Sequence, residues 1–112
     1  MNQITFDDFL KVEIHAGTVL EAIDFPKARK PAYQLTIDFG ATLGIKRSSA
    51  QITKLYTKEA LIGKQILAVT NFPPRQIANF FSEVLVLGTM GEDGTVTLIE
   101  PTHQVENGER LA

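Results

Sequence analysis

Residues 33–39 place the strongest single constraint on the fold, because apolar and polar side chains alternate along them without a break. In an extended chain, successive side chains point to opposite faces, so the apolar residues of this segment share one face. These residues are Tyr33, Leu35, Ile37 and Phe39. We therefore predict a strand of an antiparallel sheet, with one face in the core and the other exposed.

The segments on either side of this strand are also rich in residues that favour β-structure. We predict further strands at residues 12–25, 45–51, 65–70, 84–90 and 95–99. Gly17 interrupts the first of these at a point where a long strand can bend or bulge. Residues 27–31 are largely polar and are bounded by Pro26 and Pro31, so they are predicted to form a loop because proline supplies no hydrogen-bond donor to a sheet.

Helical signals are few and short. Thr5, followed by acidic residues, predicts a capped helix at residues 5–9, since a hydroxyl and early carboxylates suit the unpaired amides of a helix start. Residues 52–61 carry apolar side chains close to helical spacing. A helix that is broken near Thr57 and ended by Gly63 is predicted there.

The order of these elements predicts an all-β fold. Three strands, a helix and then more strands, with a long bent first strand, are typical of a five-stranded Greek-key barrel of the oligonucleotide-binding type, the OB-fold. A chain of 112 residues with 44% hydrophobic content can form one domain, residues 1–112, with small inserted helices and terminal extensions. Residues 101–112 are either a tail or a packed extension that could cover a neighbouring subunit.

The basic residues are concentrated in the middle of the chain. Nine of the eleven lie within residues 27–75 against two acidic residues, which gives this segment a charge of +7, whereas the flanks together carry −9. Local sign, rather than the net charge of −2, steers a charged ligand, so the middle segment suits a polyanion such as RNA. The alternative is that these cations are scattered around a solvated surface with no common face.

Several functional classes find little support in the sequence. Cysteine is absent, which excludes disulfides and thiolate metal sites, and no run approaches the roughly 20 apolar residues of a membrane span. His15 and His103 have no second ligand at a metal-binding spacing, and neither Ser48 nor Ser49 lies in a nucleophile motif. We therefore expect a cytoplasmic, non-enzymatic protein without membrane insertion, metal or cofactor.

Binding residues are better represented. Loop and third-strand cations that a barrel could bring together on phosphate are Lys27, Arg29, Lys30, Lys46 and Arg47. Asn71 and Arg75 flank two prolines on a rigid loop, from which they could reach RNA, although Asn71 could instead only stabilise the turn. Tyr33 could stack on a base, but its alternating position favours the core.

Ile77, Phe80 and Phe81 form a short apolar stripe. The stripe could belong to the core, to a seam between subunits, or to a groove for an apolar peptide, and the core is the default interpretation. Adjacent side chains cannot easily point the same way, so one of the two phenylalanines is expected to need cover from a partner surface.

Four segments of the sequence resemble the CsaA-type export-related chaperones, which belong to the wider tRNA-binding domain family. They are residues 25–33, 37–40, 46–53 and 71–77, and the resemblance extends from about Phe6 to the end of the chain. It implies an OB-type barrel that forms a homodimer and binds tRNA by shape and backbone. It also implies an alternative function as a chaperone that binds unfolded, export-bound polypeptides in an apolar groove.

The same resemblance assigns site residues. The implied RNA contacts are Lys27, Arg29, Lys30, Lys46, Arg47, Ser48, Ser49, Gln51, Asn71, Arg75 and Gln76. The terminal segments and Phe80 or Phe81 become candidates for the dimer seam. His15 departs from the family, which usually has arginine there, so a contact from the first strand would depend on pH near neutrality.

Overall fold

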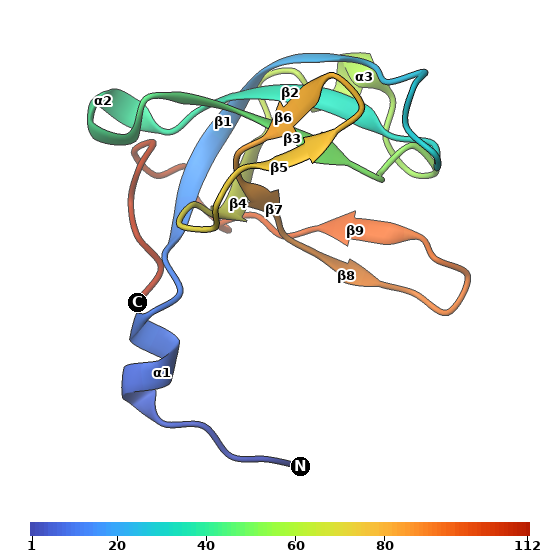
Figure 1. Cartoon of the computed structure of the whole chain (residues 1–112). Helices are drawn as coiled ribbons and strands as arrows, with labels where there is room; N and C mark the ends of the chain where they lie inside the picture. The colour runs from blue at the N-terminus through green and yellow to red at the C-terminus, as the bar shows by residue number, and fades with distance from the viewer.

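The computed structural model describes residues 1–112 and contains a curled antiparallel sheet, two short hairpins and three small helices (Figure 1). The sheet has five strands in the order β3-β2-β1-β4-β7. They are β1 (Ile14–Asp24), β2 (Tyr33–Asp38), β3 (Ile45–Ala50), β4 (Gln65–Val69) and β7 (Leu85–Val86). The hairpins pair β5 (Arg75–Ile77) with β6 (Phe80–Ser82), and β8 (Gly88–Met90) with β9 (Val96–Leu98). The helices are α1 (Phe6–Leu10), α2 (Gly40–Leu43) and α3 (Lys58–Leu61).

Hydrogen bonds between β3 and residues 82–84 nearly close this sheet into a barrel. The Glu83 amide donates to the Arg47 carbonyl at 2.8 Å, and the Ser49 amide donates to Ser82 Oγ at 3.0 Å. The Ser48 hydroxyl donates to the Val84 carbonyl at 3.1 Å. The predicted OB-type barrel is thereby confirmed.

The core lies inside this barrel, where the alternation of β2 places it. Leu35, Ile37 and Phe39 are completely buried, and the polar residues between them are half-buried on the opposite face. Tyr33 is also buried, and its hydroxyl donates to the Tyr56 carbonyl at 2.8 Å. Tyr33 is therefore a core residue and not a base-stacking surface.

The bulge in β1 lies C-terminal to Gly17, the position at which a bend or bulge was predicted. The register with β2 shifts between Val19 and Glu21, whereas Gly17 pairs regularly with Ile66 of β4. A Cβ atom at Gly17 would lie 2.7 Å from Ile37 Cγ2 and from the ring of Phe39. Glycine is needed there because the core approaches the backbone closely, which is the other common reason for a glycine in a strand.

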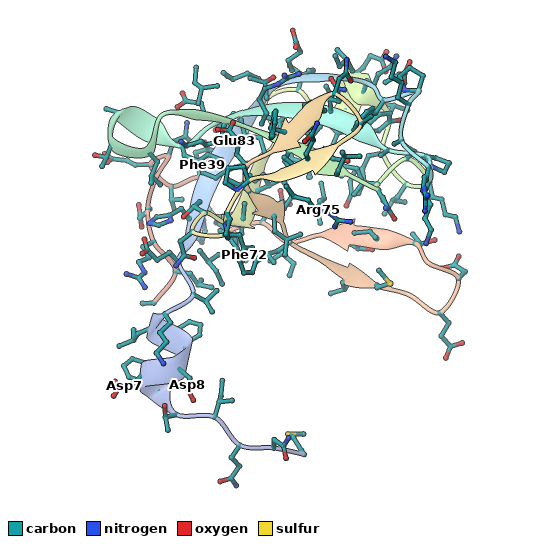
Figure 2. The ribbon with its side chains drawn as sticks, in the orientation of Figure 1. Asp7, Asp8, Phe39, Phe72, Arg75 and Glu83 are labelled. Carbon is teal, nitrogen blue, oxygen red and sulfur yellow. The ribbon has the colours of Figure 1, made fainter.

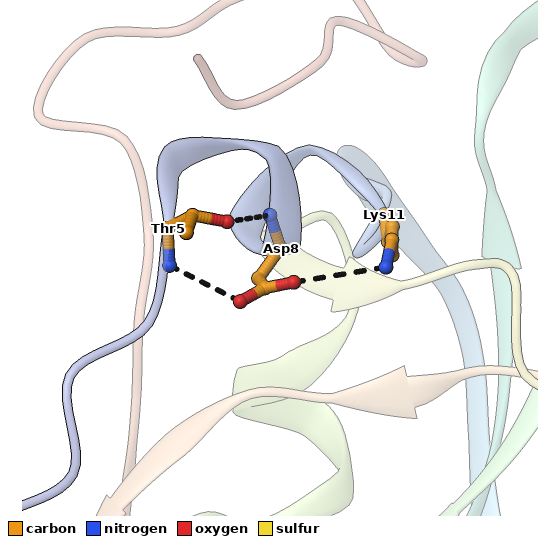
Figure 3. Close-up of polar contacts among 3 residues, drawn as sticks. All are labelled: Thr5, Asp8 and Lys11. Atoms are coloured by element: carbon orange, nitrogen blue, oxygen red, sulfur yellow. Dashed lines mark hydrogen bonds and ion pairs between the residues drawn. The ribbon is translucent and has the colours of Figure 1, made fainter.

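The predicted capped helix is present as α1. The Thr5 hydroxyl accepts from the Asp8 amide at 3.1 Å, and the Asp8 carboxylate accepts from the Thr5 amide at 3.1 Å, which completes a capping box (Figure 3). The Asp8 carboxylate also lies 3.6 Å from Lys11 Nζ. These contacts lower the pKa of Asp8, chiefly through the hydrogen bonds from Thr5.

The helix predicted at residues 52–61 is absent from the first half of that segment. Only residues Lys58–Leu61 are helical, and Thr57 caps them by accepting from the Ala60 amide. Tertiary contacts fix the preceding turns, because the Tyr56 hydroxyl accepts from the Leu98 amide while the Tyr56 carbonyl accepts from a core side chain. The strand predicted at residues 84–90 is likewise divided into β7 and β8, since the second part leaves the barrel to pair with β9 (Figure 1).

Residues 101–112 form a packed extension along this chain's own β1. The Gly108 amide donates to the Ala16 carbonyl at 2.7 Å, and the Leu111 amide donates to the Ile14 carbonyl at 2.8 Å. The buried Gln65 side chain donates to the Val105 carbonyl at 2.8 Å and accepts from its amide at 3.0 Å. None of the helices has the length and apolar character that crossing a membrane requires.

Candidate nucleic-acid interface

A second, smaller hydrophobic cluster positions the basic loop at residues 27–31. Phe25, Ala32 and Phe80 are its buried members, and Ala28 from the loop packs against them together with Ile77. The rings of Phe25 and Phe80 lie 5.3 Å apart between centroids. The Phe25 amide donates to the Ala32 carbonyl at 3.2 Å, so the two ends of the loop are joined at its base. The loop is therefore anchored to the β5–β6 hairpin.

Arg47 on β3 joins this arrangement from the barrel side. Its guanidinium carbon lies 4.4 Å from the centroid of the Phe80 ring, within cation–π distance. Its Nη2 donates to Gln34 Oε1 at 3.2 Å, which holds the side chain in place. The ring of Phe80 thus contacts Arg47 and belongs to the cluster that anchors the basic loop, so Arg47 and the loop share one aromatic anchor. We call Lys27, Arg29, Lys30 and Arg47 the basic corner.

The predicted RNA-contacting cations are all free of carboxylate partners. The three ion pairs of the chain involve Lys11, Lys58 and Lys64. The cations without an ion pair among the predicted contacts are Lys27, Arg29, Lys30, Lys46, Arg47 and Arg75. The Glu83 carboxylate accepts from the Arg47 backbone amide at 3.0 Å and forms no ion pair with the guanidinium.

Two of these cations nevertheless lie outside the basic corner. Lys46 pairs with the core residue Ile37, so it shares the inward face of β3 with buried Ser48, whereas Arg47 is on the outward face. Arg75 pairs with Ser82 and lines a groove next to the β8–β9 hairpin, toward which it points in Figure 2. Strand alternation therefore places adjacent Lys46 and Arg47 on opposite faces of β3.

Some predicted polar contacts are already used inside the protein. Ser48 is completely buried, with its hydroxyl donating to the Val84 carbonyl, so it offers nothing to a ligand. Asn71 Oδ1 accepts from the Glu13 amide at 3.0 Å and its Nδ2 donates to the Lys11 carbonyl at 2.8 Å. Asn71 therefore holds the α1–β1 connection to the end of β4, which is the structural alternative that the sequence left open.

The remaining polar candidates are accessible. Ser49 and Gln51 line the same groove as Arg75, and neither side chain forms a hydrogen bond within the chain. Gln76 is exposed on β5, where its Nε2 donates to the Ala78 carbonyl at 3.1 Å and its Oε1 has no partner. These residues keep hydrogen-bonding capacity for a ligand.

The groove itself has a volume of about 670 Å³ and lies between the end of β3, the loop before β5 and the β7–β9 region. Ten of its seventeen lining residues are hydrophobic, and they include exposed Phe72 and Leu85. Figure 2 shows Phe72 beside Arg75 on this side of the barrel. The concave, largely apolar shape is typical of a ligand site.

The apolar stripe does not form one surface. Ile77 lines the groove, Phe80 is buried in the second cluster, and Phe81 is 55% exposed on the opposite face of the hairpin. The expectation that the two phenylalanines point apart is confirmed by this burial. The hairpin at residues 75–82 was not predicted, because its strands are only three residues long and carry no clear alternating pattern.

His15 is buried in β1, beside the C-terminal extension. Its Nδ1 lies 2.8 Å from Thr70 Oγ1, and it pairs across the backbone with Arg110. Burial lowers the pKa of His15, and the charge of Arg110 adds to this effect against the opposing charge of Glu13. No group of three potential metal-ligating side chains lies together.

Comparisons with known proteins agree with this architecture. Residues 14–110 match the family model described as "Putative tRNA binding domain". The fold superimposes on the chaperone CsaA of Bacillus anthracis with a TM-score of 0.94 and 51% identity, over 99% of this chain and 100% of that one. For the CsaA chaperone protein of Picrophilus torridus the TM-score is 0.92 and the identity 54%, over 98% and 100% of the two chains. A methionine–tRNA ligase of Porphyromonas gingivalis is 39% identical over 108 residues, which span 96% of this chain and 15% of the ligase.

Proposed function

We propose, from the premise that the chain belongs to the tRNA-binding domain family, that it is a homodimeric protein that binds tRNA through its folded shape and its phosphate backbone. The observation that carries the proposal is the basic corner, in which four cations without carboxylate partners lie on β3 and on the loop that packs against the Phe80 cluster. The proposal includes a cytoplasmic location, since tRNA is found there and a chain without cysteine suits a reducing compartment.

The electrostatics leave the basic corner free to contact phosphate. A cation that already has an acidic partner gains less from a phosphate, because the partner must first be displaced or left unpaired. The basic corner has no such partner to lose. Arginines present a planar donor fork that matches phosphate oxygens, and Arg47 is already oriented by Phe80 and Gln34.

The experiment is a comparison of affinities for folded tRNA, the same tRNA without Mg²⁺, and a fully paired RNA duplex of similar length, all at one ionic strength. Recognition by shape predicts the tightest binding to the folded tRNA. Equal affinity for the three RNAs would show that the protein binds any polyanion. An absence of binding to all three would refute the proposal altogether.

Helix α1 supports the homodimer. It has no buried residue, and its segment exposes 73% of Ile4 and 70% of Phe6, while Figure 1 shows it extending away from the barrel. A five-residue helix is far shorter than the roughly 12 to 15 residues at which isolated helices become marginally stable. Cover from a second copy would remove this exposed apolar surface from water.

Sedimentation equilibrium at micromolar concentration tests the dimer. The unmodified chain is expected to sediment as a dimer, and Phe6→Asp is expected to shift it to a monomer because a charge would be buried in the seam. Thr42→Asp, a change at an exposed site on α2, serves as the control for an added charge. A monomeric unmodified chain would remove the dimer from the proposal.

The apolar groove favours a second function, that of a chaperone for unfolded polypeptide. Its lining offers exposed Phe72 and Leu85 for apolar side chains, and Arg75 at one side for a peptide carbonyl or carboxylate. A fluorescent extended apolar peptide is the probe. Leu85→Asp is expected to abolish peptide binding and leave tRNA binding intact, whereas Arg47→Gln is expected to do the reverse. Loss of both activities from either variant would indicate one shared site and refute the separation.

A further inference from the structure

The β5–β6 hairpin has two faces with different neighbours. Arg75, Ile77, Phe80 and Ser82 share the face that meets the barrel, the groove and the second cluster. Gln76 and Phe81 are the cross-strand pair on the other face, and both are exposed. Neither of these two residues lines the groove. The outward face is therefore a separate surface that no contact within the chain explains.

Phe81 is held rigidly although its ring is free. The preceding residue, Phe80, is 2% exposed and packs against Phe25, and the following residue, Ser82, accepts a hydrogen bond from the Ser49 amide. The backbone at Phe81 is thus fixed on both sides, while 55% of the residue remains accessible. A ring on such a support loses little conformational freedom when a flat group stacks on it.

Gln76 offers a directed acceptor beside this ring. Its Nε2 donates to the Ala78 carbonyl at 3.1 Å, which orients the amide and leaves Oε1 without a partner. Side chains directly opposite one another on an antiparallel pair have Cβ atoms about 4.5 to 5.5 Å apart. A planar ligand that covers the ring of Phe81 would therefore bring its edge within reach of Gln76.

The surroundings indicate an unpaired nucleic-acid base as this ligand. Phe80 links the hairpin to Arg47 and to the base of the loop that carries Lys27, Arg29 and Lys30, so phosphates on the basic corner would bring nucleotides to the hairpin. Every base has a π-face that stacks on an aromatic ring, and base edges carry N–H donors for an amide oxygen. An apolar partner would instead require a continuous apolar patch, and the neighbour of Phe81 on this face is a polar amide.

We infer that Phe81 stacks on an unpaired base of bound tRNA and that Gln76 Oε1 accepts a hydrogen bond from the edge of that base. The inference rests on the proposed tRNA-binding function and assigns it two residues that select for single-stranded regions. Because a fully paired duplex has no free base to offer, the pair would contribute to tRNA binding and not to duplex binding.

The test compares Phe81→Leu with Phe81→Tyr, using tRNA and a fully paired RNA duplex as probes. Leucine keeps the apolar area but removes the stacking surface, so Phe81→Leu is expected to weaken tRNA binding roughly 5- to 150-fold. Phe81→Tyr is expected to retain the affinity, and neither change should alter duplex binding. Gln76→Ala is expected to weaken tRNA binding less than Phe81→Leu does.

Three results would overturn the inference. They are unchanged tRNA affinity in Phe81→Leu, an equal loss of duplex binding in that variant, and its conversion from dimer to monomer in sedimentation, which would place Phe81 in a subunit seam. Thermal melting confirms that each variant is folded, which is expected because the residue is half exposed. If the unmodified chain fails to bind tRNA, the proposed function is refuted, whereas binding by the unmodified chain with no effect of leucine refutes only the stacking site.

Discussion

Neutralising the loop of the basic corner isolates its contribution to tRNA binding. The variant replaces Lys27, Arg29 and Lys30 with glutamine, which keeps polar side chains of similar length but removes three positive charges. All three residues are exposed and none is in an ion pair, so we expect the free energy of unfolding to change by less than about 0.5 kcal/mol for each substitution. Any loss of affinity can then be assigned to the RNA.

The magnitude follows from counterion release. Each phosphate contact contributes roughly 0.7 to 0.9 to the slope of log affinity against log salt, so losing the three contacts of one subunit's loop should flatten the slope by roughly 2 to 3. Between about 50 and about 200 mM salt, the affinity of the unmodified chain should therefore fall roughly 20- to 40-fold further than that of the variant. Fluorescence anisotropy of labelled tRNA at four or five salt concentrations measures both slopes.

The matched control removes the same number of charges elsewhere. Lys11, Lys58 and Lys64 each have a carboxylate partner and are not in the basic corner, so their replacement with glutamine is expected to leave the slope nearly unchanged. If both triple variants flatten the slope equally, only net charge matters and the basic corner has no special role. If neither does, the phosphate contacts assigned to the loop do not exist.

Three further predictions concern stability, measured by urea unfolding. Gly17→Ala should destabilise the fold by about 1 to 3 kcal/mol, because the added methyl would meet the ring of Phe39 at 2.7 Å. Gln65→Ala should reduce the free energy of unfolding by about 2 to 3 kcal/mol, since it removes two hydrogen bonds to Val105 from a buried site. Burial lowers the pKa of His15 below its ordinary value of 6.5, so the unfolded chain takes up a proton that the folded chain resists. The free energy of unfolding should accordingly fall as the pH decreases below about 6.5, and His15→Gln should lack this part of the pH dependence.

The strands that could be predicted from the sequence are those whose pattern is local. Residues 33–39 alternate because one face of β2 lies in the core and the other is half-buried. The helix that begins after Thr5 has its whole capping box within four residues. The helix expected at residues 52–61 fails because its apolar spacing is also satisfied by turns. Hydrogen bonds of Tyr56 to residues 23 and 42 positions away select those turns, and no local pattern reports them.

In the candidate site, too, the residue types could be predicted from the sequence, whereas their arrangement could not. The residue types of the basic corner were identifiable from charge, but its geometry depends on Phe80 meeting Phe25 and Arg47 from two other elements. Ser48 and Asn71, for which the resemblance implied RNA contacts, form hydrogen bonds within the protein. A hydroxyl or amide has the same chemistry whether it serves a ligand or the protein's own backbone, and only the fold decides which.

The two faces of the β5–β6 hairpin also bear on whether RNA and polypeptide binding can coexist in one molecule. Because strand alternation sends Ile77 toward the groove and Phe81 away from it, a ligand on one face leaves the side chains of the other face unchanged. Phe80 lies on the same face as Ile77, and its ring is fixed in the second cluster in contact with Arg47. A structural change caused by peptide would reach the basic corner by moving this buried ring or through Glu83, which lines the groove and hydrogen-bonds to the Arg47 backbone. Since close-packed side chains and paired backbone resist such movement, we expect the two activities to be independent.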